Sequence, residues 1–163
     1  MTGTWKLRTD GGARGNPGPA GIGVVLEDPS GEVVAEVAKG IGYATNNVAE
    51  YQALIEGLRL AAAHDARRVD VFSDSLLMVQ QMKGRYKVKN PGLQSLFDQA
   101  RQLARGFDKV TFTAVRRELN KAADALANQA MDEQEIAGGG RGPRSGAGLG
   151  SDGGRRGSQD HLF

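Results

Sequence analysis

The chain has 163 residues, two histidines and no cysteine, a length that suits one domain with its own core. The lack of cysteine excludes disulfides and thiolate metal sites, so any chemistry must rest mainly on carboxylates, which favour hard cations such as Mg²⁺ or Mn²⁺. No apolar run approaches the roughly 18 residues of a membrane span, and the first residues lack a signal-peptide profile. We therefore expect a cytoplasmic protein that makes no membrane contact.

The formal net charge of +2 belongs to the C-terminal segment. Residues 138–163 contain four arginines, two aspartates and ten glycines, so the preceding chain is neutral overall. Such a composition cannot bury enough apolar surface to offset the entropy lost on ordering. We predict a folded domain over 1–134 and a Gly/Arg-rich disordered tail or linker stub over 135–163, with a possible second domain beyond it. A weak tether for nucleic acid is the alternative interpretation of the tail.

Hydrophobic periodicity predicts nine elements in chain order. Strands are expected at 5–10, 22–27, 33–41, 69–73 and 110–115. Helices are expected at 47–63, 75–82, 91–105 and 120–132. The turn Pro29-Ser30-Gly31 predicts a hairpin between the second and third strands. The order βββαβααβα predicts an α/β fold with a five-stranded mixed sheet flanked by helices.

Glu50 is the most informative carboxylate. In its helix the polar residues Gln52, Glu56 and Arg59 mark the solvent face, and Glu50 lies about 160° to 180° from that face at about 100° per residue. A carboxylate among apolar neighbours is costly unless it is paired or binds a metal. A buried ion pair, or a first-turn carboxylate favoured by the helix dipole, remains the alternative.

Three further aspartates lie at element ends. Asp10 ends the first strand; an Asp-Gly turn is the alternative, but residues 11–20 are too many for a tight turn, and their glycines would let the backbone approach a ligand. Asp74 follows the fourth strand, where it could simply cap the next helix. Asp124 lies in about the first turn of the last helix, where it could be a carboxylate stabilised by the helix dipole. Four carboxylates at one sheet edge cannot all stay ionised without cations. Two divalent ions would satisfy them, as in enzymes that cleave phosphodiesters.

Four segments, in order and spacing, resemble the motifs of the type 1 ribonuclease H family, and the resemblance covers about residues 4–132. They are Thr9-Asp10-Gly11-Gly12 with Gly15-Asn16-Pro17-Gly18-Pro19-Ala20-Gly21, Thr45-Asn46-Asn47-Val48-Ala49-Glu50, Ser73-Asp74-Ser75, and Asn120-Lys121-Ala122-Ala123-Asp124-Ala125-Leu126-Ala127. The resemblance implies an endonuclease that hydrolyses the RNA strand of RNA–DNA hybrids and leaves 5′-phosphate and 3′-hydroxyl ends. It also implies that Asp10, Glu50, Asp74 and Asp124 are the catalytic carboxylates and hold two Mg²⁺ ions, with Mn²⁺ as a possible substitute.

The resemblance further implies a set of hybrid-binding residues. They are Gly11, Gly12, Asn16, Thr45, Asn46, Asn47 and Ser75. Backbone amides and asparagine side chains suit recognition of the ribose 2′-hydroxyl, which distinguishes RNA from DNA.

The chain departs from the family in two basic segments and at position 76, which is leucine where several relatives have a polar residue. The loop 115–119 lacks a histidine found in many members; Arg116 or Arg117 takes over phosphate contact or product release, or both are ordinary surface residues. The family's basic protrusion is shortened to residues 83–89. If that segment is extended, three of its basic side chains share one side and form a phosphate track; they are Arg85, Lys87 and Lys89. A solvated charge run is the alternative. These departures place the chain nearest to the compact, histidine-lacking members.

Two rival functions are weaker. A non-catalytic hybrid-binding module would be expected to lose a carboxylate, and all four are present. A junction resolvase or integrase core would share the fold and clustered carboxylates, but the segments 15–19 and 45–50 argue against it. A monomer is the default expectation.

Overall fold

The structure is a computed structural model that describes residues 2–139. Its centre is a five-stranded sheet in the order β3-β2-β1-β4-β5. The strands are β1 (Thr4–Ala13), β2 (Gly18–Glu27), β3 (Val33–Ala44), β4 (Arg68–Ser73) and β5 (Lys109–Ala114). β1, β2 and β3 form an antiparallel meander, whereas β4 pairs parallel to β1, and β5 pairs parallel to β4. The predicted mixed sheet is confirmed.

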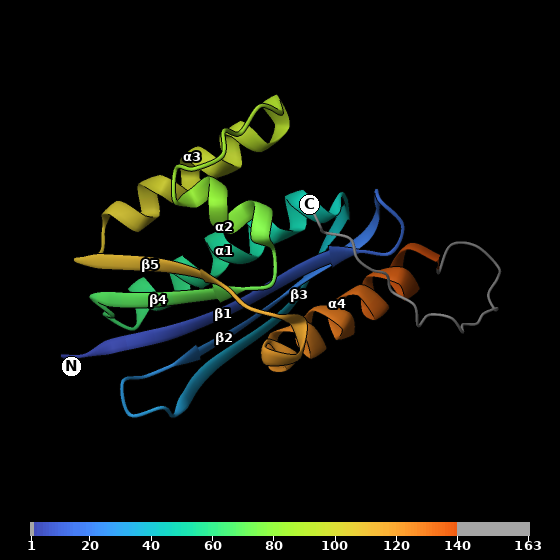
Figure 1. The fold of residues 1–163 in the computed structure, drawn as a ribbon. Helices are drawn as coiled ribbons and strands as arrows, with labels where there is room; N and C mark the ends of the chain where they lie inside the picture. The colour runs from blue at the N-terminus through green and yellow to red at the C-terminus, as the bar shows by residue number, and fades with distance from the viewer. Residues whose placement is uncertain (1, 140–163) are drawn as a thin grey trace.

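Helices cover both faces of this sheet. They are α1 (Asn46–Ala63), α2 (Leu76–Met82), α3 (Pro91–Arg105) and α4 (Lys121–Gly139), and the 3₁₀ turn η1 (Arg117–Leu119) precedes the last of them. Figure 1 shows α1, α2 and α3 on one side of the sheet and α4 on the other. The predicted order βββαβααβα is therefore confirmed. Among residues 2–139, none of the helices has the length and apolar character that a membrane crossing needs.

The main core lies between the sheet and α1. Alternate residues of β1, Trp5 and Leu7, point to this face and are buried there with Leu54 and Leu58 of α1. Ala53, Gly57 and Ala61 are also buried, and they follow one another at intervals of four residues, so α1 buries this face against the strands. This packing fixes the axis of α1 and, with it, the direction in which its first turn points.

The packing of α4 uses small residues. A Cβ atom on Gly21 would lie 2.7 Å from the Cβ of Ala130, and one on Gly23 would lie 2.6 Å from the backbone nitrogen of Ala127. Neither distance is compatible with an ordinary contact, so the two glycines of β2 let the helix backbone rest directly on the sheet. Alanines on the facing side of α4, at positions 123, 127 and 130, are fully buried in this contact.

The predicted long connection after Asp10 is wrong. β1 continues to Ala13 and β2 begins at Gly18, so only residues 14–17 connect them. The Arg14 N–H donates to the Pro19 carbonyl at 2.8 Å and closes this short turn. Gly11 is therefore a strand residue, and its missing side chain serves α1: a Cβ there would collide with the Ala49 carbonyl and the Glu50 nitrogen.

The last helix is longer than predicted. α4 continues to Gly139, so residues 135–139 of the predicted tail are helical. Two contacts with the sheet region hold this end of the helix: the Gln134 side chain accepts from the Gly42 N–H at 3.0 Å, and Glu135 pairs with Arg14 at 3.1 Å. The remainder of the predicted tail, residues 140–163, lies outside the described residues.

Candidate active site

Three acidic side chains meet at one edge of the sheet. Asp10 lies in β1, Glu50 in the first turns of α1, and Asp74 directly after β4. One carboxylate oxygen from each lies within 4.8 Å of those of the other two. Only 6% of Asp10 and 2% of Glu50 is exposed, so these charges are withdrawn from water.

Sheet topology explains why the two aspartates meet. β1 and β4 run parallel and pair as far as Arg8 and Phe72. Asp10 and Asp74 each follow two residues beyond that last pair, at the carboxyl ends where α/β proteins place their sites. Asp10 also lies directly opposite Gly23 of β2, so its partner in that strand has no side chain.

Glu50 reaches the aspartates because α1 crosses β1 at Gly11. The helix begins with Thr45 as its cap, whose hydroxyl accepts from the Val48 N–H at 3.2 Å. This fixes the first turn, and the absent side chain at Gly11 lets that turn lie against the strand. The inward orientation predicted for Glu50 from its helical phase is what the structure shows.

Asp124 approaches from the other face of the sheet. It is half-buried in the first turn of α4 and is not one of the three residues within 4.8 Å. Its negative charge nevertheless raises the pKa of Asp10, Glu50 and Asp74, so it lies within electrostatic reach of all three.

Asn120 anchors this helix, a role that the sequence did not indicate. Its buried side-chain amide donates to the Thr9 carbonyl at 2.9 Å, next to Asp10 in β1. The bond ties the start of α4 to the strand just past the point where β4 stops pairing with it. Asn120 belongs to one of the four sequence motifs, but only the fold shows that its side chain donates to the Thr9 carbonyl.

Burial and mutual repulsion make the negative charges of this cluster electrostatically costly. Burial is the main cause that raises the pKa of Asp10, followed by the charges of Glu50, Asp74 and Asp124. The pKa of Glu50 is also raised by burial first and then by Asp74, while the nearby Gly11 N–H and the charge of Arg117 oppose this. Burial raises the pKa of Asp74 as well, against the opposing effects of Asp10 and Arg117.

The oxygen atoms of the site fit a divalent cation. Both carboxylate oxygens of Glu50 and the Oδ1 of Asp74 are buried and accept no hydrogen bond. Buried acceptors without donors are costly, and a hard cation is the partner that an all-oxygen carboxylate set prefers. The carboxylate oxygens present therefore suit Mg²⁺ or Mn²⁺ as ligand atoms.

The two arginines before α4 have different surroundings. The Nε of Arg117 lies 3.5 Å from the Oδ2 of Asp74, so this guanidinium borders the acidic cluster. Arg116 pairs instead with Glu118 at 3.2 Å, and its side chain is 80% exposed. Of the two predicted candidates for phosphate contact, the structure brings only Arg117 to the carboxylates.

Several predicted hybrid-binding residues have structural partners. Ser75 is buried and caps α2 by accepting from the Met78 N–H at 3.2 Å. The Asn46 Oδ1 accepts from the Ala13 N–H at 2.8 Å, and the Asn46 N–H donates to the Asn16 Oδ1 at 3.0 Å. These bonds join the β1–β2 connection to the start of α1. Asn47 is exposed beside them.

The two predicted glycine contacts differ in surroundings. Gly11 is buried beneath α1, whereas Gly12 is half-buried and close to the Asn46 side chain, 3.7 Å from where its own Cβ would lie. Of these two glycines, Gly12 is therefore the one that lies close to Asn46.

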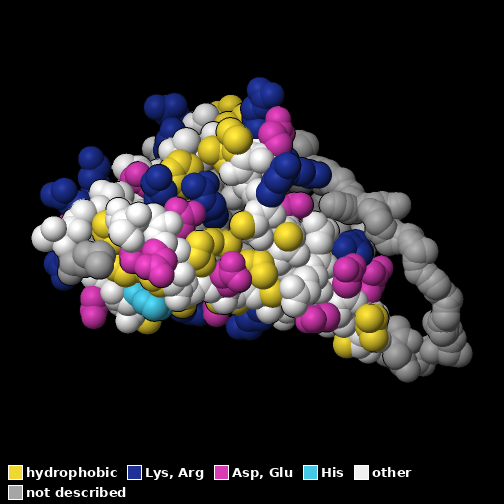
Figure 2. All heavy atoms as spheres, turned by 90° about the horizontal axis from the view of Figure 1, so that it is seen from below, with side chains coloured by type: hydrophobic (Ala, Val, Ile, Leu, Met, Phe, Trp, Pro, Cys, Tyr) yellow, Lys and Arg dark blue, Asp and Glu magenta, His cyan; other side chains and the backbone are white. Residues whose placement is uncertain are grey.

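The predicted phosphate track forms part of the link between α2 and α3. All three of its basic side chains are exposed, and Val88 between them is buried. They are Arg85, Lys87 and Lys89. On the face drawn in Figure 2, basic and acidic side chains are interspersed, so no continuous basic patch covers that side.

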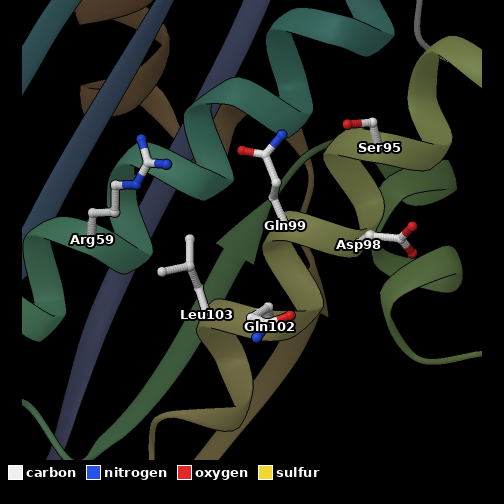
Figure 3. Close-up of a pocket in the computed structure, with 6 residues that line it drawn as sticks. All are labelled: Arg59, Ser95, Asp98, Gln99, Gln102 and Leu103. Atoms are coloured by element: carbon white, nitrogen blue, oxygen red, sulfur yellow. The ribbon is translucent and has the colours of Figure 1, made fainter.

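A pocket of about 530 Å³ lies elsewhere, between α1 and α3. Figure 3 shows Arg59 reaching toward it from α1 and Ser95, Gln99 and Leu103 lining it from α3. Arg59 follows Glu50 by nine residues, about 13 Å along the helix. The pocket is therefore separate from the acidic cluster.

The five-stranded mixed sheet with helices on both faces is a ribonuclease H-like fold, and the carboxylates clustered at the ends of β1 and β4 form its candidate metal centre. Comparisons with known proteins agree. The reverse transcriptase-like family matches residues 8–130. Ribonuclease HI of Halobacterium salinarum is 45% identical over 124 residues, which cover 76% of this chain and 62% of that protein.

Solved structures give the same result. The N-terminal ribonuclease H domain of Rv2228c from Mycobacterium tuberculosis, solved as a fusion with maltose-binding protein, is 46% identical with a TM-score of 0.82, covering 84% of this chain and 99% of that one. LC11-RNase H1 in complex with an RNA/DNA hybrid is 45% identical with a TM-score of 0.74, covering 79% and 97%. The chain belongs to the type 1 ribonuclease H family. It spans 35% of the length of its mycobacterial curated relatives.

Proposed function

We propose that the chain is an endonuclease that hydrolyses the RNA strand of RNA–DNA hybrids with the help of divalent cations. The observation that carries this proposal is the group of three carboxylates within 4.8 Å of one another, in which both Glu50 oxygens and the Oδ1 of Asp74 are buried and have no hydrogen-bond donor. Family membership supports the reaction, and the hybrid bound to LC11-RNase H1 supports the substrate.

Asp10, Glu50, Asp74 and Asp124 would hold two Mg²⁺ ions, or Mn²⁺ in their place. When bound, the ions would activate water, stabilise the leaving 3′ oxygen and so leave 5′-phosphate and 3′-hydroxyl ends. The protein holds the first three carboxylates in place before any ion arrives, because β1, β4 and α1 are fixed by sheet pairing and core packing. Their low exposure strengthens every electrostatic interaction made there.

The hybrid would be recognised beside this cluster. The exposed Asn16 and Asn47, with Asn46, the Thr45 cap and the Gly12 backbone, surround the junction of the β1–β2 connection and α1. Amide and hydroxyl groups there suit contacts to ribose 2′-hydroxyls across a minor groove. Because Ser75 and Gly11 are occupied by capping and packing, we assign them a supporting role.

Basic side chains would contact the phosphates. The exposed residues of the α2–α3 link supply a sequence-independent phosphate track; they are Arg85, Lys87 and Lys89. Arg117, which already lies beside Asp74, would contact the scissile region or the leaving product. Arg116 is left as a surface residue because its partner is Glu118.

We also propose that residues 1–134 with the rest of α4 act as a monomeric catalytic unit. The Gly/Arg-rich segment after it would link to a second domain. The name "bifunctional protein" carried by the longer M. tuberculosis relative supports this extension.

The test is cleavage of a short RNA–DNA hybrid labelled on the RNA strand, with Mg²⁺, with Mn²⁺ and with chelator. We expect metal-dependent RNA cleavage by the wild type and none by Asp10→Asn. Duplex DNA and a four-way junction serve as specificity controls. A hybrid that is bound but stays intact with either metal would contradict the proposal and favour a binding module; junction cleavage would favour a resolvase.

A further inference from the structure

A chain of polar contacts runs from the β1–β2 connection across α4 to Asp124. Arg14 begins it: its side chain is only 11% exposed, and its Nη2 donates to the Asn128 Oδ1 at 3.2 Å. Asn128 lies one helical turn after Asp124, and its Nδ2 donates to the Asp124 carbonyl at 3.0 Å and to the Asp124 Oδ2 at 3.3 Å.

The direction of every bond in this chain is fixed by chemistry. A guanidinium can only donate hydrogen bonds, and an ionised carboxylate can only accept them. The amide oxygen of Asn128 must therefore face Arg14, and its NH₂ group must face Asp124. A flipped amide would place two donors together at Arg14 and two acceptors together at Asp124. Arg14 thus selects the one orientation in which Asn128 can hold the carboxylate.

Asp124 is the carboxylate that most needs such support. Strand pairing and the crossing of α1 over β1 bring the other three carboxylates together. Asp124 lies outside that 4.8 Å group, on a separate helix, α4. Its side chain is half-buried and so retains rotamer freedom unless a partner removes it. The Asn128 amide is that partner.

We propose that Arg14 and Asn128 are positioning residues of the metal site. Arg14 orients the Asn128 amide, and the amide holds the Asp124 carboxylate in the direction of the other three. This inference rests on the proposed function, because it assigns the two residues to the site that would bind the cations.

Arg14 also pairs with Asp132 at 2.8 Å and with Glu135 at 3.1 Å. These two carboxylates are 61% and 45% exposed, and exposed ion pairs contribute little to stability. They provide a matched control, because Asp132→Asn with Glu135→Gln removes both ion pairs and leaves the contact between Arg14 and Asn128. Arg14→Lys does the reverse: it keeps a positive charge for the ion pairs but loses the planar fork that holds the amide.

The experiment is titration calorimetry of Mn²⁺ into the full chain without nucleic acid. Outer partners of metal ligands typically change metal affinity by about 10- to 100-fold. We expect Asn128→Ala to lower Mn²⁺ affinity by about tenfold, at the low end of that range, and Arg14→Lys to lower it in the same direction. The variant that combines Asn128→Ala with Arg14→Lys should lose no more Mn²⁺ affinity than Asn128→Ala alone, because both changes act through one carboxylate. The control pair should keep wild-type affinity.

Hybrid cleavage by the same proteins separates the two proposals. At saturating Mn²⁺, Asn128→Ala and Arg14→Lys should keep the wild-type KM for the hybrid. Wild-type affinity in Arg14→Lys, additive losses in the double variant, or an equal loss in the control pair would overturn the positioning role even if the wild type cleaves the hybrid. The expected pattern of Mn²⁺ affinities with an intact hybrid would instead uphold the positioning role and contradict the nuclease.

Discussion

Replacing Gly23 with alanine tests how closely α4 must approach the sheet. The new Cβ would lie 2.6 Å from the Ala127 nitrogen and 2.9 Å from the Leu126 Cβ, and it would collide with the Ala123 carbonyl. Ordinary contact begins at 3.4 Å, so the difference from 2.6 Å requires α4 to move outward by about 0.8 Å or more. Helix backbone atoms cannot yield one at a time, so the whole first half of α4 must shift. Asp124 moves with it.

Overpacking of this kind costs about 1–3 kcal/mol, and each kcal/mol lowers Tm by about 2–4 °C in a domain of this size. A displacement near 1 Å at a catalytic group can cost about 100-fold in rate. We therefore expect Gly23→Ala to lower stability in urea denaturation and to reduce hybrid cleavage more than that stability loss explains. Gly106→Ala is the control, since its nearest new contact is the Leu103 carbonyl at 3.3 Å, at the end of α3. Wild-type stability and cleavage in Gly23→Ala would refute the close-packing argument.

Three further predictions follow from the site. The pKa values of Asp10 and Glu50 are raised above their ordinary values of 3.8 and 4.5. In the pH range between the ordinary and the raised pKa values, the folded metal-free protein therefore binds more protons than the unfolded chain. Its stability should fall as the pH rises through this range. Asp10→Asn should accordingly stabilise the metal-free protein at neutral pH in urea denaturation while abolishing Mn²⁺ binding; an unchanged or lower stability would contradict this. Arg117→Ala should slow turnover more than it weakens hybrid binding, whereas Arg116→Ala should change neither; unchanged steady-state kinetics for Arg117→Ala would contradict its role. Replacing all three basic residues of the α2–α3 link by alanine should weaken hybrid binding and reduce the salt dependence of log affinity by about one unit per lost phosphate contact; an unchanged salt dependence would leave the link as a solvated charge run.

Hydrophobic periodicity predicted the fold well because the apolar face of each strand and helix packs against the apolar face of another. Trp5 and Leu7 alternate on one face of β1, and the apolar stripe of α1 faces them. The same helical phase turned Glu50 inward, and this orientation depends only on the sequence of its own helix. The pattern of a single helix can therefore predict that a carboxylate points into the core. The aspartates at element ends, Asp10, Asp74 and Asp124, then indicate at which edge of the sheet these elements meet.

The glycine-rich segment after Asp10 was misinterpreted because glycine has low strand propensity. Gly11 of this segment is needed by α1, and the nearby Gly21 and Gly23 are needed by α4, and both helices come from elsewhere in the chain. A single sequence shows that glycine is present but does not show whether a turn, a ligand or a helix backbone requires it. The same limit applies to the end of α4, where Gln134 and Glu135 find partners about a hundred residues earlier in the chain.

Capping was ambiguous for a different reason. Both Asp74 and Ser75 are good helix-capping residues, and the sequence could not say which one caps α2. The structure gives that role to Ser75, whose hydroxyl accepts from the Met78 N–H. Asp74 is thereby left with a buried oxygen that has no donor. Ser75 therefore caps the helix, and the Oδ1 of the preceding Asp74 stays available to a cation.

The origin of Asp124 on a separate helix has a consequence for how the site can vary. Asp10, Glu50 and Asp74 are fixed by contacts that also hold the core together, so their geometry cannot change without loss of the fold. The position of Asp124 depends instead on the glycine contacts of α4, on Asn120 and on Asn128 oriented by Arg14. Substitutions in that second group can move one ligand while the other three stay in place. We therefore expect substitutions of Asn128 and Arg14 to change metal affinity at little cost in core stability, and variants around Glu50 to change both together.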